Sequence, residues 1–301
     1  MAAEPHDTPV RSPLRRAVKF ILILMLVLVL AGWLTSALDG MTSFGGPYLA
    51  VVRIEGVLVD ATATLDELER YAKNPAVLGV VLRIDSPGGA VVPAQEIYDA
   101  VQRLRTKHGK KVVVSMGSVA ASGGYYIAAA SDKIVANPGS LTGSIGVIME
   151  IPNVQGLMKK VGVESVVIKS GRSKDVGSPF REMKPEERAL LQAVLDDVHD
   201  QFIEAVAKGR GLEVVEVRRL ADGRIFTGRQ AQSVGLVDQL GGLPDAIETA
   251  ANLAKIEGEP AVLESQPGFS LKRLLESKWF GGGVAGFGLS PAIRLEYRMA
   301  W

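Results

Sequence analysis

Short apolar runs alternate with helical patterns along the first half of the chain, and this alternation constrains the fold more than any other feature. Tyr48 to Ile54, Val77 to Ile84 and Lys111 to Met116 are rich in valine and other apolar residues, which is typical of buried strands. Helical patterns follow the first two runs, from Thr64 to Lys73 and from Pro93 to Lys107. Strands joined by helices form parallel sheets with right-handed crossovers. The sequence therefore predicts an α/β fold.

The second half continues with shorter elements and one long helix. Further strands are predicted at Asp132 to Val135 and Ser165 to Ile168, and an amphipathic helix from Pro185 to Lys208. The apolar face of this helix is expected to pack in the core or against another subunit, and His199 on its polar side is expected to be solvated. Three shorter helices are predicted after it, at Val214 to Leu220, Gln230 to Val234 and Pro244 to Ile256.

Charge and residue usage exclude several classes of function. With 34 basic and 33 acidic residues, the formal net charge is +1, so no strongly basic face and no nucleic-acid partner are expected. The absence of cysteine excludes disulfides, thiolate metal sites and a cysteine nucleophile. Only 3 histidines occur among the 301 residues, and they do not cluster. We therefore expect neither a metal site nor a cofactor.

An uncharged apolar segment, Phe20 to Leu38, predicts a membrane anchor near the N-terminus. At about 1.5 Å per residue its helix would be about 28 Å long, close to the hydrocarbon thickness of a bilayer. Basic residues precede it at positions 11, 15, 16 and 19, which favours a cytoplasmic N-terminus and an extracytoplasmic main domain. The alternative is a cleaved signal peptide, since Thr35-Ser36-Ala37 is an acceptable cleavage site. An uncleaved, single-pass anchor in the cytoplasmic membrane is the interpretation we favour.

Ser122 stands after the Lys111 strand, at the expected start of a helix, which is a suitable position for a nucleophile. It is equally a favoured helix N-cap. Two glycine-rich turns follow two predicted strands, Ser86-Pro87-Gly88-Gly89 and Ser122-Gly123-Gly124. If the turns meet, the backbone amides of Gly89 and Gly123 could stabilise an oxyanion. Two ordinary strand-to-helix turns are the alternative.

A serine nucleophile needs a base, and the histidines are poorly placed to supply one. His108 is expected at the opposite end of the Lys111 strand, and no G-x-S-x-G motif is present. A neutral lysine is the remaining option. Residues alone do not choose between Lys169 and Lys174, and either could be a solvated surface lysine. Ser144 either belongs to a small-residue turn or orients that lysine.

Several motifs, in this order, resemble the bacterial signal peptide peptidase A family over about Tyr48 to Ala254. They are Asp85-Ser86-Pro87-Gly88-Gly89, Ala121-Ser122-Gly123-Gly124-Tyr125-Tyr126, Leu141-Thr142-Gly143-Ser144-Ile145-Gly146, Lys169-Ser170-Gly171 with Lys174-Asp175, Ser178-Pro179 and Arg181-Glu182-Met183, and Phe226-Thr227-Gly228-Arg229 with Gly235-Leu236-Val237-Asp238. The resemblance implies a fold like those of the Clp protease subunit and the crotonases, a spiral of parallel strands and helices. The short, single-domain form of the family is the one that the chain resembles.

The resemblance also implies the site. Ser122 would be the nucleophile, Lys174 the general base and Ser144 the hydroxyl that orients it, with Gly89 and Gly123 forming the oxyanion hole. A further set of residues would pair with an extended substrate by strand addition: Gly88, Ala90, Val91 and Val92. The implied substrates are apolar remnants of signal peptides. A homo-octameric dome is implied, in which adjacent subunits supply the serine and the lysine.

The expected organisation has five parts. They are a cytoplasmic tail (1–19), a transmembrane anchor in contact with lipid (20–38), a linker (39–47), a peptidase domain (48–256) and a C-terminal extension of unknown role (257–301). We expect a membrane-anchored serine endopeptidase of the Ser–Lys type. The alternatives are a crotonase-like acyl-thioester hydratase or isomerase, a related membrane peptidase that acts on full-length membrane proteins, and a catalytically idle membrane scaffold.

Overall fold

The structure is a computed structural model, and its contacts divide the chain into two units, residues 1–46 and residues 47–301. The residues that it describes are 19–20, 22–32, 47–264 and 296–298.

The first unit contains the predicted membrane anchor. Residues 19–20 and 22–32 are helical. Among the residues described, no helix is both long enough and apolar enough to cross a membrane. Residues 21 and 33–38 of the predicted anchor, with the alternative cleavage site, lie outside the described residues. The transmembrane helix therefore stays a prediction.

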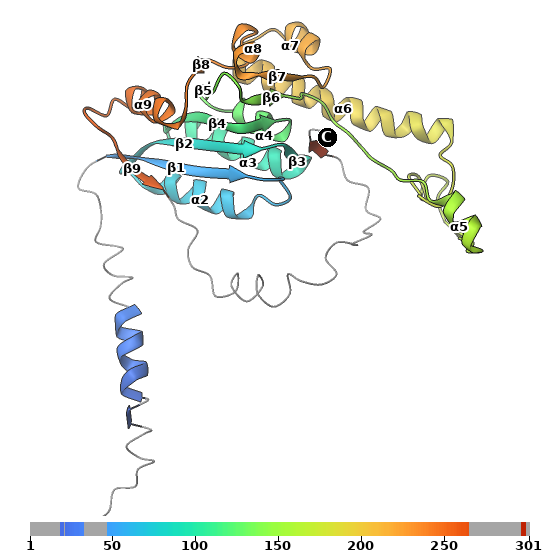
Figure 1. The fold of residues 1–301 in the computed structure, drawn as a ribbon, viewed down its shortest axis with the longest axis horizontal. Helices are drawn as coiled ribbons and strands as arrows, with labels where there is room; N and C mark the ends of the chain where they lie inside the picture. Colours follow the sequence, from blue (N-terminus) through green and yellow to red (C-terminus); the bar gives the residue numbers. More distant parts are fainter. Residues whose placement is uncertain (1–18, 21, 33–46, 265–295, 299–301) are drawn as a thin grey trace, which may run out of the picture. The chain divides into compact units, whose positions relative to one another are not determined.

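A mixed sheet of eight strands forms the centre of the second unit, counted over the described residues (Figure 1). Its strands are β1 (Tyr48–Glu55), β2 (Val77–Ser86), β4 (Lys111–Ala121), β5 (Lys133–Ala136), β6 (Leu141–Gly143), β7 (Ile225–Thr227), β8 (Gln239–Leu240) and β9 (Ala261–Glu264). The strands pair in the order β7-β6-β4-β2-β1-β9, while β5 pairs with β4 and β8. All of these pairs are parallel except β6 with β7. The predicted α/β fold is confirmed, but the sheet is mixed.

Helices cover both faces of this sheet, as the alternation of side chains along β1 requires. Leu49 and Val51 belong to an apolar cluster with α9 (Leu243–Ala254). Ala50 and Val52 point to the other face and belong to the larger core. The helices packed into that core include α2 (Thr62–Lys73), α3 (Val91–Thr106) and α4 (Gly123–Ala128).

A long segment of the second unit contributes no buried residue to this core. It contains α5 (Gln155–Val161) and leads into α6 (Pro185–Arg210), and none of residues 146–186 is buried. We call residues 150–184 the lysine arm. Figure 1 shows α5 at the end of α6 that lies away from the sheet. The C-terminal half of α6 packs in the core, and the short helices α7 (Val214–Leu220) and α8 (Gly228–Ser233) follow it.

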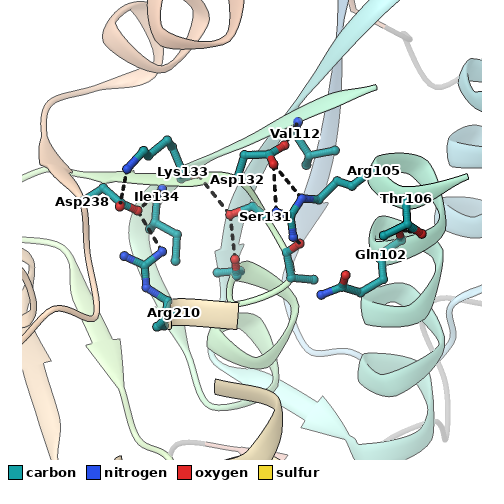
Figure 2. A network of polar contacts seen from close by, with 12 residues as sticks. Gln102, Arg105, Thr106, Val112, Ser131, Asp132, Lys133, Ile134, Arg210 and Asp238 are labelled. Atoms are coloured by element: carbon teal, nitrogen blue, oxygen red, sulfur yellow. Dashed lines mark hydrogen bonds and ion pairs between the residues drawn. The ribbon is translucent and has the colours of Figure 1, made fainter. Parts of the chain in front are cut away.

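Two aspartates tie the helices to the start of the central strands (Figure 2). Asp132 pairs with Arg105 of α3 at 2.8 Å and accepts the backbone N–H of Val112 at 2.8 Å. Asp238 pairs with Arg210 of α6 at 2.8 Å and with Lys133 at 3.0 Å. Burial alone would raise the pKa of Asp238, but the hydrogen bond and charge of Arg210 outweigh it, and the pKa lies below its usual value. These contacts hold α3 and α6 to the starts of β4 and β5.

Several boundaries differ from those predicted. The helix expected from Thr64 begins at Thr62, because Asp60 accepts the backbone N–H of Thr62 at 2.6 Å. The strand expected at residues 165–168 is absent, since these residues are exposed coil on the lysine arm. β9 lies beyond residue 256, where the peptidase domain was expected to end, and pairs with β1.

Candidate active site

Ser122 lies at the end of β4, immediately before α4, in an unusual backbone conformation. Its φ is 53° and its ψ is −117°, a region that costs a residue with a side chain about 1–3 kcal/mol. Its backbone is held on both sides, because its N–H donates to the Gly143 carbonyl at 2.8 Å and its carbonyl accepts from Tyr126 at 2.8 Å. Such strain is found where a fold must hold a functional side chain in place.

The Ser122 hydroxyl makes no hydrogen bond that would give it a structural role. The side chain is fully buried, and within the described residues Oγ has no hydrogen-bond partner. Ser122 occupies the N-cap position of α4, as expected, but its side chain makes no capping hydrogen bond. A buried hydroxyl without a partner is unfavourable. These properties fit a reactive group better than a structural one.

The two glycine-rich turns predicted to meet do lie together. Ser86 donates to the Gly56 carbonyl at 2.6 Å and accepts the Gly88 N–H at 3.1 Å, which fixes the first turn. Gly88 has a φ of 95°, and a β-carbon on it would lie only 2.7 Å from the backbone nitrogen of Gly123. Glycine is therefore required at position 88, both for the conformation and for the contact between the turns. The contact brings the amide of Gly123 beside the first turn.

Beyond this turn runs a short strand, β3 (Gly88–Ala90), which already carries a second strand. β10 (Glu296–Arg298) pairs with it antiparallel, with Tyr297 opposite Gly89 (Figure 1). Sequence analysis assigned no role to this C-terminal segment. The edge of β3 thus accepts an extended peptide.

Strand pairing at this edge ends earlier than expected. Val91 and Val92 were expected to pair with a substrate strand, but they are the first residues of α3. Gly88 and Ala90 remain in the pairing strand, so two of the four predicted substrate-binding residues lie in β3.

The structure does not bring Lys174 to Ser122 within one chain. Lys174 is exposed on the lysine arm, and the Ser122 hydroxyl has no partner among the described residues. The two candidate lysines nevertheless differ. Lys169 pairs with Asp175 and donates to the Arg172 carbonyl at 2.9 Å. The Lys174 amine makes no such contact in the described part of the chain, so it is free to act elsewhere.

Arg181 holds the lysine arm to the start of α6, a contact that sequence analysis did not predict. It pairs with Glu187 at 2.6 Å and with Asp175 at 2.9 Å. Hydrogen bonds from Arg181 lower the pKa of Glu187 to about 2, and they also lower the pKa of Asp175. The Arg181-Glu182-Met183 motif was the only signal in the sequence. Arg181 thus fixes the turn that carries Lys174.

Ser144 lines a cavity of about 320 Å³ together with His199 of α6. Ser144 has a φ of 50°, and its N–H donates to the Arg224 carbonyl at 2.8 Å. Asp196 and Asp222 also line the cavity. His199 was expected to be solvated, but it is half-buried, and its Nε2 is buried without a partner among the described residues. This cavity, which both polar and apolar residues line, has room for a further side chain.

No group of three or more histidine or acidic residues that could hold a metal ion occurs in the described part of the chain.

Comparison with known proteins supplies the family. The model of peptidase family S49 matches residues 104–257, and that of the Clp protease family matches residues 60–140. A protein of Synechocystis sp. named as a protease is 47% identical over 221 residues, which cover 72% of this chain and 78% of that protein.

Two further relatives carry names that specify a peptidase. A protein of Enterococcus faecium named signal peptide peptidase SppA is 38% identical, over 73% of this chain and 63% of its own length. Protease 4 of Haemophilus influenzae is 32% identical, over 76% of this chain and 39% of its own length. The chain thus spans less than two thirds of each of these two relatives.

Proposed function

The chain belongs to peptidase family S49 and has a Clp protease-like α/β fold, and on that premise we propose that it is a serine endopeptidase that cuts extended apolar peptides, with Ser122 as nucleophile and Lys174 as general base. One observation carries the proposal. The strained, buried Ser122 hydroxyl lies beside a strand edge on which an extended peptide, β10, is already seated. A nucleophile next to a peptide-binding edge is what a peptidase requires.

The proposed chemistry is acyl transfer in two steps. A neutral Lys174 takes the proton from Ser122 Oγ as that oxygen attacks the carbonyl carbon of the substrate. The amides of Gly89 and Gly123 donate to the oxyanion, and each such donor is worth about 10²–10³ in kcat. The lysine then gives its proton to the leaving amine, and water hydrolyses the acyl-enzyme. Ser144 orients the lysine amine by a hydrogen bond.

A second copy of the chain is proposed to supply the lysine, within a homo-octamer. Lys174 is exposed and does not reach Ser122 of its own chain. The lysine arm and the start of α6 expose large apolar side chains that the described chain leaves uncovered, at Leu157, Val161, Val163, Val166, Val167, Ile168, Phe180, Leu190 and Val194. Such a surface is typical of a subunit interface. Burial between copies would also favour the neutral form of Lys174.

Membrane anchoring and the substrate class rest on sequence. We propose that residues 20–38 anchor the chain in the cytoplasmic membrane, with residues 1–19 inside and the peptidase domain outside. The uncharged segment and the basic residues before it support this topology. Residues 39–47 then form a linker. Peptides released in the bilayer, above all remnant signal peptides, are the substrates that such an anchor favours.

Other functions fit less well. Family membership argues against an acyl-thioester hydratase or isomerase. A peptidase for full-length membrane proteins would use the same site, so only its substrates would differ. A scaffold without activity would not need a strained, buried serine. His199 is a second candidate base, since its unpartnered Nε2 shares a cavity with Ser144.

The test is cleavage of a synthetic apolar signal peptide by the full-length protein in detergent, followed by mass spectrometry. We expect Ser122→Ala and Lys174→Ala each to lower the rate by at least about 10⁴-fold. Lys169→Ala is the matched control and should retain most of the activity. Activity lost in Lys169→Ala but kept in Lys174→Ala would reassign the base.

The pH profile separates the two candidate bases. A lysine base gives activity that rises with pH into the alkaline range, because even a lysine whose neutral form is favoured by burial starts from a usual pKa of about 10.4. A histidine base gives half-maximal activity near pH 6.5. Loss of activity in His199→Gln together with such a profile would overturn the assignment of Lys174.

A further inference from the structure

Basic residues gather at the end of the second unit where the central parallel strands begin. Residues 103–111, from the last turn of α3 to the first residue of β4, include five basic residues and one histidine but no acidic residue. The helix dipole accounts for Arg103 and Arg105, because basic side chains are favoured in the last turn of a helix. It does not account for the lysines beyond the end of α3, at positions 107, 110 and 111.

Only some of these charges have a partner within the chain. Arg105 pairs with Asp132 at 2.8 Å, and the Lys110 amine donates to two backbone carbonyls at 2.6 and 2.8 Å, so both side chains are held in the structure. Three further side chains are exposed and form no ion pair within the described part of the chain: Arg103, Lys107 and Lys111. Their charges are therefore available to an anionic partner.

A pocket of about 370 Å³ lies between α2 and α3 at this end. Its apolar lining is buried or half-buried, and consists of Leu65, Leu68, Ala72, Ala100 and Leu104. Its charged and titratable lining is exposed, and consists of Glu69, Lys73, Arg103 and His108. The Glu69 carboxylate pairs with Lys73 at 2.6 Å, so it does not neutralise Arg103. Apolar side chains beneath cationic ones match the glycerol and phosphate of a phospholipid headgroup.

The start of β1 lies against the same end of the second unit. The Tyr48 N–H donates to the Ala76 carbonyl at 2.9 Å, and the Tyr48 hydroxyl accepts from Asn74 at 2.8 Å. Asn74 directly follows Lys73, and its carbonyl accepts from Lys110 at 2.8 Å. Residues 39–47 separate Tyr48 from the predicted anchor, and a chain of this length spans at most about 35 Å. The proposed anchor therefore keeps these basic residues within that distance of a bilayer.

We propose that this end of the second unit docks on the anionic headgroups of the membrane that holds the chain, through a surface that we call the basic end: Lys73, Arg103, Lys107, His108 and Lys111. The inference goes beyond the peptidase function and uses the proposed anchor only to bring the surface close to lipid. β4 begins at Lys111 and ends at Ala121, next to Ser122. Docking would therefore turn the candidate active site away from the bilayer.

The test uses the full-length protein with one reporter, which the absence of cysteine allows. Thr106→Cys, at the end of α3, carries an environment-sensitive fluorophore, and Ser118→Cys, exposed near the other end of β4, is the matched control. The protein is placed in nanodiscs of phosphatidylcholine, alone or with about a quarter of phosphatidylglycerol. We expect a blue shift from the Thr106→Cys label only in the anionic discs. It should vanish in about 1 M NaCl, where the Debye length is about 3 Å.

A matched pair of variants tests the basic end itself. Arg103→Gln with Lys111→Gln removes two charges from it, and Arg219→Gln with Arg229→Gln removes two exposed charges from α7 and α8. Each basic residue at an anionic surface contributes about a 5-fold preference for it. We expect the ratio of docked to undocked chains to fall about 25-fold in the first variant and to stay unchanged in the second. An equal fall in both would refute the basic end.

Retention in the discs separates this inference from the anchor. Protein held by neutral and anionic discs alike, with the same emission in both, would overturn the inference and leave the anchor intact. Protein that binds only the anionic discs, with the blue shift, would support the basic end and refute the anchor. Glycerol phosphate added to protein in neutral discs should leave the emission unchanged. A blue shift there would overturn a membrane partner in favour of a free phosphate compound.

Discussion

Replacing Ser86 by alanine tests how the first glycine turn is held. The Ser86 side chain is fully buried and makes two hydrogen bonds, to the Gly56 carbonyl and from the Gly88 N–H. The Gly88 N–H is buried, so its loss of a partner costs roughly 1–3 kcal/mol. Gly56 is exposed, so water can replace its partner and the loss there is about 0.5 kcal/mol. Together these give a loss of about 2 kcal/mol.

The assay is thermal unfolding followed by circular dichroism, with peptide cleavage measured at 25 °C. A loss of about 2 kcal/mol corresponds to a fall in Tm of about 4–8 °C for a domain of this size. Ser118→Ala, an exposed serine on β4, is the matched control and should leave Tm unchanged. Activity should fall more than the folded fraction does, because the turn carries Gly89. A Tm shift below about 1 °C would show that the Ser86 hydroxyl does not hold this turn.

Three further predictions concern the C-terminal strand, the lysine arm and the anchor. Tyr297→Ala should raise the rate of cleavage of an added peptide several-fold, since β10 and a substrate strand cannot occupy the edge of β3 together; an unchanged rate would contradict this. Arg181 lowers the pKa of Glu187 to about 2 from an unfolded value of 4.5. The stabilisation that the Arg181–Glu187 pair provides is therefore fully present above about pH 4.5 and is lost as the pH falls towards 2. Hydrogen exchange in residues 150–184 should therefore quicken, after correction for intrinsic rates, between pH 5 and pH 3, and Glu187→Gln should exchange rapidly at both. The full-length protein should resist extraction from membranes by alkaline carbonate, and a chain that begins at residue 47 should be soluble; extraction of both would refute the anchor.

Local sequence patterns were sufficient to predict four strands of the central sheet, β1, β2, β4 and β5, but not β6, β7, β8 and β9. The valine-rich runs that became β1, β2 and β4 are buried on both faces along most of their length, so most of their residues contribute to the signal. The glycine turns were predictable for a similar reason, because glycine marks close backbone contacts such as that of Gly88 with Gly123.

Other elements depend on contacts that no local pattern encodes. β10 has three residues and owes its place to its pairing with β3 and to the packing of Tyr297 on the rings of Tyr126 and Phe202. The strand predicted at residues 165–168 was wrong. The apolar side chains of these residues are typical of a buried strand but are exposed in the single chain. The position of His199 on the polar side of its helix predicted a solvated side chain. Residues of other segments pack near it and line the same cavity, which the helix pattern alone does not show.

Local sequence patterns also predicted the position of Ser122, but they did not choose between the candidate lysines. Ser122 follows a strong strand signal and its position at the helix start was correct. Lys174 lies on an arm whose surroundings the single chain does not supply, so its role stays a proposal. A site completed by another subunit cannot be read from the spacing of residues in one chain.

We propose that a serine and a lysine from two copies of the chain form one active site. The test mixes Ser122→Ala and Lys174→Ala chains by co-expression and assays cleavage of the synthetic apolar signal peptide. Each variant alone should be inactive. In an equal mixture about a quarter of the sites combine an intact Ser122 with an intact Lys174 from a neighbour, so about a quarter of the wild-type activity should return. If both residues instead act within one chain, the mixture will stay as inactive as its components.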